Sequence, residues 1–343
     1  MPARRAHPGA AHRSRRHPAH PADLLGGQCV LTASNRKDGE PTFGRRLAAR
    51  LLAEGRPARV LAPPSETAGW PPGTEIVVGD VARPGETPAA FAGIERLFLA
   101  GALPATVREA VTLARAGGVA RIAVLSSHGP DMEIEFEPES WYWLAIEVVV
   151  ERSGAWWTHL QPSPIMNQTL RAGYPRSRAS LAAAIRAGEV IREPYPDSAV
   201  PFIDEDDLAA IAVAALFEDG HAGQTLTVHG EPISLREQLR LIGQALGRDI
   251  PFAEQTPEQA AEHARRQGMA EQEIEQWLAA KATWAATLDD PDYRRWLDLG
   301  ITTVTRVLGR PPRSYADWLA DQVEVFGSGR PANRGGRRVE AAG

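Results

Sequence analysis

The sequence predicts an α/β fold in which a doubly wound parallel sheet is joined to a smaller, mainly helical C-terminal lobe. In the first half of the chain, short apolar runs bounded by turn residues alternate with helix-length stretches, which is typical of βαβ units. In the second half this alternation stops and helical patterns dominate. A chain of 343 residues is long enough for one large unit or two modest domains.

The predicted elements of the first half are delimited by residues that begin or end helices. The helix predicted over 42–54 follows Pro41 and ends before Gly55, and both residues are typical of those positions. Two further helices are predicted over 105–115 and 139–153. Strands are predicted over 29–33, 58–63, 75–79, 96–100, 121–126 and 156–161. In a parallel sheet the ligand crevice lies beyond the carboxyl ends of the strands, so we expect functional residues just after these runs.

The second half predicts six helices and one further strand, a composition that suits a lobe closing over the crevice. The helices are predicted over 180–187, 205–216, 235–246, 257–265, 271–286 and 293–308, and the strand over 225–228. We therefore expect a sheet domain over 28–165 and a helical substrate lobe over 166–326, with a return to the sheet near 200–230. The segments 1–27 and 327–343 lack apolar periodicity, which predicts a disordered basic extension and a flexible tail.

Composition excludes several classes of function. The net charge is −5, and because the first 24 residues hold five arginines, the rest of the chain is still more acidic, which argues against a nucleic-acid partner. No apolar run approaches the length of a membrane span, and a secretory signal is not evident. A single cysteine, Cys29, excludes an internal disulfide. We expect a cytoplasmic monomer or homodimer that acts on a small molecule and holds no metal.

Several segments, taken in order, carry a family resemblance. They are Gly44-Arg-Arg-Leu-Ala-Ala-Arg-Leu-Leu, Val78-Gly-Asp80, Leu125-Ser-Ser127, Thr158-His-Leu-Gln-Pro162 and Pro201-Phe-Ile-Asp204. With these the chain resembles the NmrA-like group of atypical short-chain dehydrogenases/reductases over about residues 28–326. The resemblance implies a Rossmann-type NAD(P)-binding domain and a small substrate lobe. Members of the group include NAD(P)H-dependent reductases of quinones and other small molecules, and others bind the dinucleotide only as a sensor.

The phosphate-binding turn departs from that family. The family carries Thr-Gly-Ala-Thr-Gly-x-x-Gly after its first strand, so that the backbone can approach the pyrophosphate. Here Ala33 replaces the first glycine, about five residues are inserted, and only Gly44 is well placed. Arg36 can supply charge to a phosphate instead, and Asp80 would lie near the adenine. If a dinucleotide binds, as NADP or NAD, these four residues are its expected contacts; the segment after the second strand offers no base or acid to read a 2′ group.

The hydride-transfer residues of the family are also missing. Ser127, or its neighbour Ser126, stands at the family's serine position, but the lysine position holds Trp143 and the tyrosine position holds Glu139. Gln161 replaces the usual arginine before a proline. The sequence therefore favours a protein that has lost hydride chemistry and uses no cofactor.

The loop that follows the fifth strand offers a replacement site. We predict His128, Tyr142, Asp131, Glu139 and Ser127 as catalytic candidates, because an imidazole beside a carboxylate forms a competent proton-transfer pair. Substrate contacts are expected from Trp141 and Trp143, which can stack on a flat ligand, and from Asn167. The glutamates at 133, 135 and 137 alternate with apolar residues, which is equally typical of a half-exposed strand or lid edge. Among the other histidines, His159 is expected in the core, and His221 and His229 at the surface.

Three functions follow from these observations. The first is a cofactor-independent acid–base catalyst, of dehydratase, isomerase or cyclase type, on an aromatic or polycyclic substrate of secondary metabolism. The second is an NAD(P)H-dependent oxidoreductase similar to quinone reductases. The third is a non-catalytic regulator that binds a ligand.

Overall fold

A computed structural model of the chain describes residues 29–32, 43–128, 130–133, 141–170, 180–287 and 290–327. The predicted extension over 1–27 lies outside these residues, as do Ala33, Arg36, Glu139 and the predicted tail beyond Gly327. The loop that replaces the family's phosphate turn is therefore described only at its two ends.

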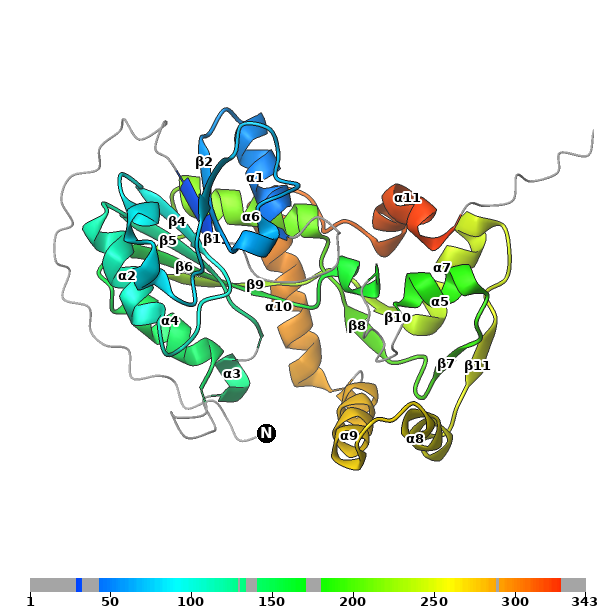
Figure 1. The fold of residues 1–343 in the computed structure, drawn as a ribbon. Helices are drawn as coiled ribbons and strands as arrows, with labels where there is room; N and C mark the ends of the chain where they lie inside the picture. The colour runs from blue at the N-terminus through cyan, green and yellow to red at the C-terminus, as the bar shows by residue number, and fades with distance from the viewer. Residues whose placement is uncertain are drawn as a thin grey trace, which may run out of the picture.

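A seven-stranded parallel sheet forms the centre of the larger lobe, at the left of Figure 1, and it confirms the predicted α/β fold. The strand order is β3-β2-β1-β4-β5-β6-β9. Every neighbouring pair is parallel, for example β1 with β4, where Val30 is in register with Leu97. The strands are β1 (Cys29–Thr32), β2 (Ala58–Ala62), β3 (Glu75–Val78), β4 (Arg96–Leu99), β5 (Arg121–Leu125), β6 (Trp156–Pro162) and β9 (Gln224–Val228).

Helices cover both faces of this sheet, as a doubly wound fold requires. Successive residues of a strand point to opposite faces, so Phe98 and Leu97 belong to two different cores. One face is packed by α1 (Phe43–Ala53), α6 (Glu205–Phe217) and α10 (Pro291–Leu308), and the other by α2 (Val107–Ala116) and α4 (Trp143–Glu151). Strands buried on both sides read as continuous apolar runs, which is why the sequence predicts them well.

The remaining elements form the smaller lobe, at the right of Figure 1. Its third core is made by α5 (Leu181–Ala187), α7 (Leu235–Leu246) and α11 (Tyr315–Phe326). Two small sheets pair β8 (Ala199–Pro201) with β10 (Pro232–Ser234) and β7 (Ile191–Glu193) with β11 (Phe252–Glu254). Helices α8 (Pro257–Arg266) and α9 (Glu271–Thr287) complete the lobe. The sequence does not predict these four three-residue strands.

Helix ends in this lobe follow ordinary capping chemistry. The hydroxyl of Ser234 accepts a hydrogen bond from the Glu237 amide at the start of α7, and Gly247 ends that helix in the left-handed region. At α8, Thr256 and Gln259 form a reciprocal capping box. These local signals fix where the helices begin and end.

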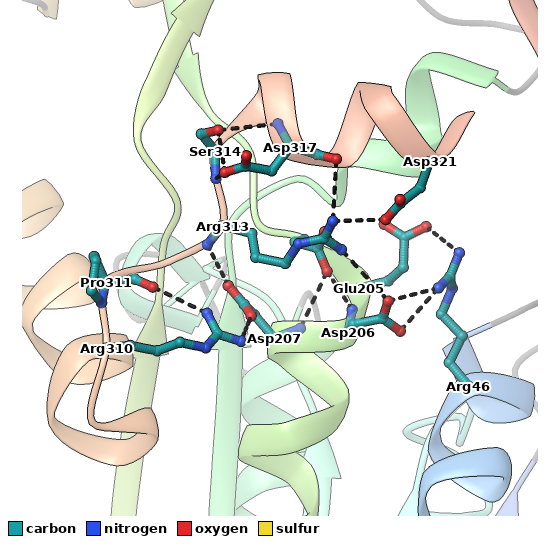
Figure 2. A network of polar contacts seen from close by, with 11 residues as sticks. Arg46, Glu205, Asp206, Asp207, Arg310, Pro311, Arg313, Ser314, Asp317 and Asp321 are labelled. Atoms are coloured by element: carbon teal, nitrogen blue, oxygen red, sulfur yellow. Dashed lines mark hydrogen bonds and ion pairs between the residues drawn. The ribbon is translucent and has the colours of Figure 1, made fainter. Parts of the chain in front are cut away.

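A network of charged side chains joins the sheet domain to the small lobe (Figure 2). Asp204 caps α6 by accepting hydrogen bonds from the amides of Asp206 and Asp207. Arg313, in the connection before α11, lies 3.0 Å from the completely buried carboxylate of Asp204. From the first turn of α1, Arg46 donates to Asp206 at 2.9 Å. The start of α1 is thereby tied to α6 and to the chain leading into α11.

Candidate active site

The strand order reverses between β1 and β4, and this places the candidate site. In such sheets ligands bind beyond the carboxyl ends of the strands at the switch point. Helix α1 begins at this edge with Phe43 and the buried Gly44, and its first turn contains no acidic residue. The positive end of the helix dipole is therefore left without an acidic side chain of its own first turn.

The predicted adenine contact, Asp80, lies directly beyond β3. Its Oδ1 accepts a hydrogen bond of 2.9 Å from the Ala82 amide, and Arg83 lies 3.6 Å from Oδ2. Oδ1 thus closes a turn, whereas Oδ2 makes only a long ion pair with Arg83. Oδ2 can therefore accept a hydrogen bond from an additional donor.

His128 lies beyond β5, close to the end of β6. Burial lowers the pKa of its imidazole below the usual 6.5, and a hydrogen bond to the Pro162 backbone partly opposes this shift. The ring meets Trp296 of α10 edge to face, with centroids 6.3 Å apart. His128 is therefore uncharged in most molecules near neutral pH and lies against an aromatic wall.

His229 follows β9 at the same edge, and its predicted surface position is wrong. The residue is completely buried, its ring centroid lies 3.9 Å from that of Trp296, and Nδ1 is 3.4 Å from the Leu297 carbonyl oxygen. Burial lowers the pKa of His229 to about 4, and the neighbouring charge of His128 adds to the shift. His221 is also buried rather than exposed, and Thr158 donates a hydrogen bond of 2.8 Å to its carbonyl oxygen.

The sequence analysis missed His229 and Trp296 as site residues. A signal for His229 was present, because it stands one residue after the last predicted strand and therefore at the same edge as His128. Trp296 gives no comparable signal, since its helix reaches the crevice only through tertiary packing. The residues that follow β5 and β9, and the end of β6, thus lie close to the indole ring of Trp296.

Tyr142 lies between the ends of β4 and β5. Its hydroxyl donates a hydrogen bond of 3.3 Å to the Ala102 carbonyl oxygen, and 38% of the residue is exposed. Its ring meets Trp143 edge to face at 5.0 Å, and Trp143 itself packs against the core beneath α2 and α4. The tyrosine is thus the more accessible of the two aromatic residues.

The acidic loop after β5 is helical at its start, where the sequence predicts a strand or lid edge as one alternative. Residues Pro130–Glu133 form α3, and the Glu133 carboxylate accepts hydrogen bonds from the amides of Tyr142, Trp143 and Leu144. Glu133 therefore caps α4 and holds Tyr142 in place. Asp131 lies on α3, but its side chain falls outside the described residues. Trp141 precedes the helix and is partly buried.

A second group of polar residues is buried under the sheet rather than at the crevice. Glu147 of α4 accepts a hydrogen bond of 3.1 Å from Gln161. Burial raises the pKa of Glu147, and the charge of His159 and the nearby Ser126 hydroxyl act in the opposite direction. His159 is completely buried, as predicted. This group stabilises the packing of α4 on the sheet, whereas Ser127, which is only partly buried, remains at the edge.

Asn167 lies in the 3-10 turn Met166–Leu170 that follows β6. The residue is 4% exposed, and its Oδ1 accepts no hydrogen bond from any described residue. A buried acceptor without a partner is costly, so this amide suits a ligand contact. No cluster of three or more metal-ligating side chains occurs among the residues that the structure describes. Within that part of the chain, no helix has the length and apolar character needed to cross a membrane.

The fold and this edge define an NAD(P)-binding Rossmann protein of the NmrA-like type. The chain belongs to the NAD(P)H-binding family, which matches residues 42–219. It is 31% identical over 295 residues to (4-alkanoyl-5-oxo-2,5-dihydrofuran-3-yl)methyl phosphate reductase of Streptomyces griseus, covering 82% of this chain and 95% of that protein. It is 30% identical over 264 residues to NAD(P)H azoreductase of Xenophilus azovorans, covering 75% and 85%.

Solved structures share the fold at lower identity. The NADPH-dependent quinone oxidoreductase of Escherichia coli complexed with NADPH gives a TM-score of 0.60 at 18% identity, covering 86% of this chain and 99% of that one. The Citrobacter sp. triphenylmethane reductase complexed with NADP(H) gives 0.60 at 18% identity, covering 85% and 99%. A mutant NmrA protein gives 0.50 at 15% identity, covering 68% and 74%.

The expectation that no cofactor is used is wrong. The relatives include an NAD(P)H-dependent reductase, and proteins of the same fold hold NADP(H) in their crystals, which points to a nicotinamide cofactor. The described residues fit such a group, because Gly44 opens α1 at the switch point, Asp80 keeps a carboxylate oxygen beyond β3, and Asn167 keeps a buried acceptor. These features are retained although glycines of the phosphate turn are missing.

Proposed function

We propose that the protein is an NAD(P)H-dependent reductase of a small molecule. The observation that carries this proposal is the switch point between β1 and β4, with α1 beginning there inside the segment matched by the NAD(P)H-binding family. Two relatives of at least 30% identity, aligned over most of their own length, are reductases, which supports the same reaction.

Residues 28–165 hold the dinucleotide in this proposal, and residues 166–326 supply the substrate lobe. Gly44 and the start of α1 bind the diphosphate, and Arg36 adds the charge that compensates for the lost glycines. Asp80 accepts a hydrogen bond from the adenine. A bound dihydronicotinamide supplies a hydride, and the substrate needs one further proton to complete its two-electron reduction.

His128 supplies that proton. Its imidazole lies at the ends of β5 and β6, and its position against Trp296 keeps water away from one side. Only the imidazolium form of His128 can donate this proton, and the lowered pKa makes that form a stronger acid than an imidazolium in water. Ser127 binds the substrate oxygen, and Tyr142 does so when its hydroxyl turns from the Ala102 carbonyl oxygen to the substrate. Trp141 and Trp143 stack on the conjugated part of the substrate.

The substrate is a flat, conjugated acceptor. The names of the two relatives specify an oxo-dihydrofuran and an azo compound, which share a double bond that accepts two electrons. The rings of His128, His229 and Trp296 form an aromatic wall that suits such a group. A tailoring role in secondary metabolism remains a prediction from the sequence, as does the choice between monomer and homodimer.

Purified protein tests the proposal by oxidation of NADPH and NADH with three acceptors: 1,4-naphthoquinone, methyl red and an α-acyl butenolide. We expect protein-dependent oxidation of a nicotinamide with at least one acceptor. A protein that binds neither dinucleotide in a thermal-shift titration would contradict the proposal. A ligand at a hundred times its Kd stabilises the folded state by about 2.7 kcal/mol, so binding is readily detected.

A further inference from the structure

We propose that Arg45 binds the 2′-phosphate of the adenosine ribose, so that the protein prefers NADPH to NADH. This inference rests on the proposed function, since it concerns the same cofactor. The sequence offers no base directly after the second strand, where a 2′-phosphate is usually read. The structure brings one there from another element.

Arg45 stands in the first turn of α1 and its side chain crosses to the loop beyond β2. Its Nη2 donates a hydrogen bond of 2.7 Å to the Ala68 carbonyl oxygen, and its guanidinium carbon lies 5.7 Å from the centre of the Trp70 ring. Gly69 makes room for it, because a Cβ there would lie 3.3 Å from that carbon and its φ of +77° favours glycine. In Rossmann domains the segment beyond the second strand meets the adenosine ribose.

The two neighbouring arginines of α1 have different partners. Arg46 is held by carboxylates, with Glu205 at 3.2 Å and Asp206 at 2.9 Å (Figure 2). Among the residues that the structure describes, no carboxylate lies within ion-pair distance of Arg45, and its buried Nε donates no hydrogen bond. The guanidinium of Arg45 therefore lies at the loop beyond β2 with donors that can bind the negatively charged 2′-phosphate.

A guanidinium is well suited to this ligand, because its planar fork matches two phosphate oxygens and it stays charged at every physiological pH. A ribose hydroxyl of NADH offers no charge to the same group. The backbone contact to Ala68 orients the fork, and among the described residues its other donors are left for a ligand. Preorganisation of this kind lowers the entropic cost of binding.

Glu66 is the group that opposes a phosphate here. It ends the 3-10 turn Pro64–Glu66, close enough to Arg45 and Asp80 for the charge of each to act on its carboxyl group. Burial raises the pKa of Glu66, and Arg45 acts against that shift. An ionised Glu66 repels a 2′-phosphate, so its removal is expected to strengthen NADPH binding, whereas Arg83, 3.6 Å from one oxygen of Asp80, partly offsets the charge of that carboxylate.

Fluorescence titration of the full chain with NADPH and with NADH tests the assignment. We expect wild type to bind NADPH about tenfold tighter than NADH, and R45Q to lose about tenfold in NADPH affinity while NADH affinity stays within about twofold. R50Q is the matched control, because Arg50 lies on the same helix, exposed, and pairs with Glu54. Adenosine 2′,5′-bisphosphate should compete better than adenosine 5′-monophosphate in wild type and equally in R45Q.

E66Q provides a second test that does not depend on how well R45Q folds. It should tighten NADPH binding and leave NADH binding unchanged or weaker. Equal binding of the two dinucleotides to wild type, or an equal loss of both in R45Q, would overturn the role of Arg45 while leaving the reductase intact. Binding of neither dinucleotide would instead overturn the proposed function.

Discussion

His229 and Trp296 pack against each other with ring centroids only 3.9 Å apart, and this contact joins the last strand of the sheet to helix α10. The imidazole is completely buried, and its Nε2 has no hydrogen-bond partner among the described residues. It is therefore neutral in the folded protein and easily charged once the protein unfolds, and this difference links stability to pH.

Stability should fall as the pH is lowered through the range in which His229 titrates. Its pKa is about 4 in the folded state and near 6.5 when exposed, so the unfolded state binds the proton first. No stability is lost above about pH 6.5, and the loss amounts to roughly 3 kcal/mol once the pH has fallen to about 4. Urea unfolding measured across this range checks it. In H229F this part of the pH dependence should disappear; an unchanged slope would refute the assignment.

Alanine at position 300 should disturb the same contact. A Cβ at Gly300 would lie 2.1 Å from Nδ1 of His229, which is far too close. The imidazole ring is rigid, so the whole His229 side chain or the helix would have to shift. We expect G300A to lower the free energy of unfolding by about 1–3 kcal/mol, as overpacked cores do. Leu299 is exposed on the same helix, so L299A is the control. Adding H229A to G300A should recover part of the loss, and no recovery would mean that the two residues do not interact.

Reduction should depend on pH through His128. Because burial lowers its pKa below 6.5, the proton-donating form is lost as the pH rises, so kcat should decrease from acidic to neutral pH. H128N should reduce kcat by about a hundredfold and flatten the profile. H263N serves as control, since His263 lies on α8 in the small lobe. A profile in H128N that still follows the wild-type shape would assign the proton to another group.

Loss of Arg313 should destabilise the junction of the two lobes. Its guanidinium faces the fully buried carboxylate of Asp204, and removal of one partner leaves a buried charge without compensation. We expect R313A to lose about 3 kcal/mol of unfolding free energy in urea. D321A, which removes only an exposed partner of Arg313, should lose less than about 1 kcal/mol. Equal losses in the two variants would contradict a special role for Asp204.

The sheet could be predicted because its strands are buried on both faces and therefore carry uninterrupted apolar runs. Strands β7 and β11 could not, since each has three residues and its partner lies some sixty positions away in the sequence. Helix ends were predictable where the signal is local, as at Gly55, which follows α1. The fold could thus be predicted from the sequence wherever the stabilising contacts are local or repeated.

The candidate site could be predicted from the sequence only in part. His128 and Tyr142 could be placed at the crevice because they follow predicted strands, but the role of Glu133 as a helix cap depends on a turn that brings it back to residue 142. Arg45 escaped notice because its helix position gives no hint that its side chain reaches Ala68. The cofactor was misjudged because one altered loop removes only some of the contacts that bind a dinucleotide.

Calorimetric titration of the full-length chain with NADPH tests the central claim most directly. The account predicts saturable binding of one NADPH per chain, with the heat abolished when adenosine 2′,5′-bisphosphate already fills the site. Titrations with NADPH and with NADH that both give no heat, together with an unchanged melting temperature, would contradict it.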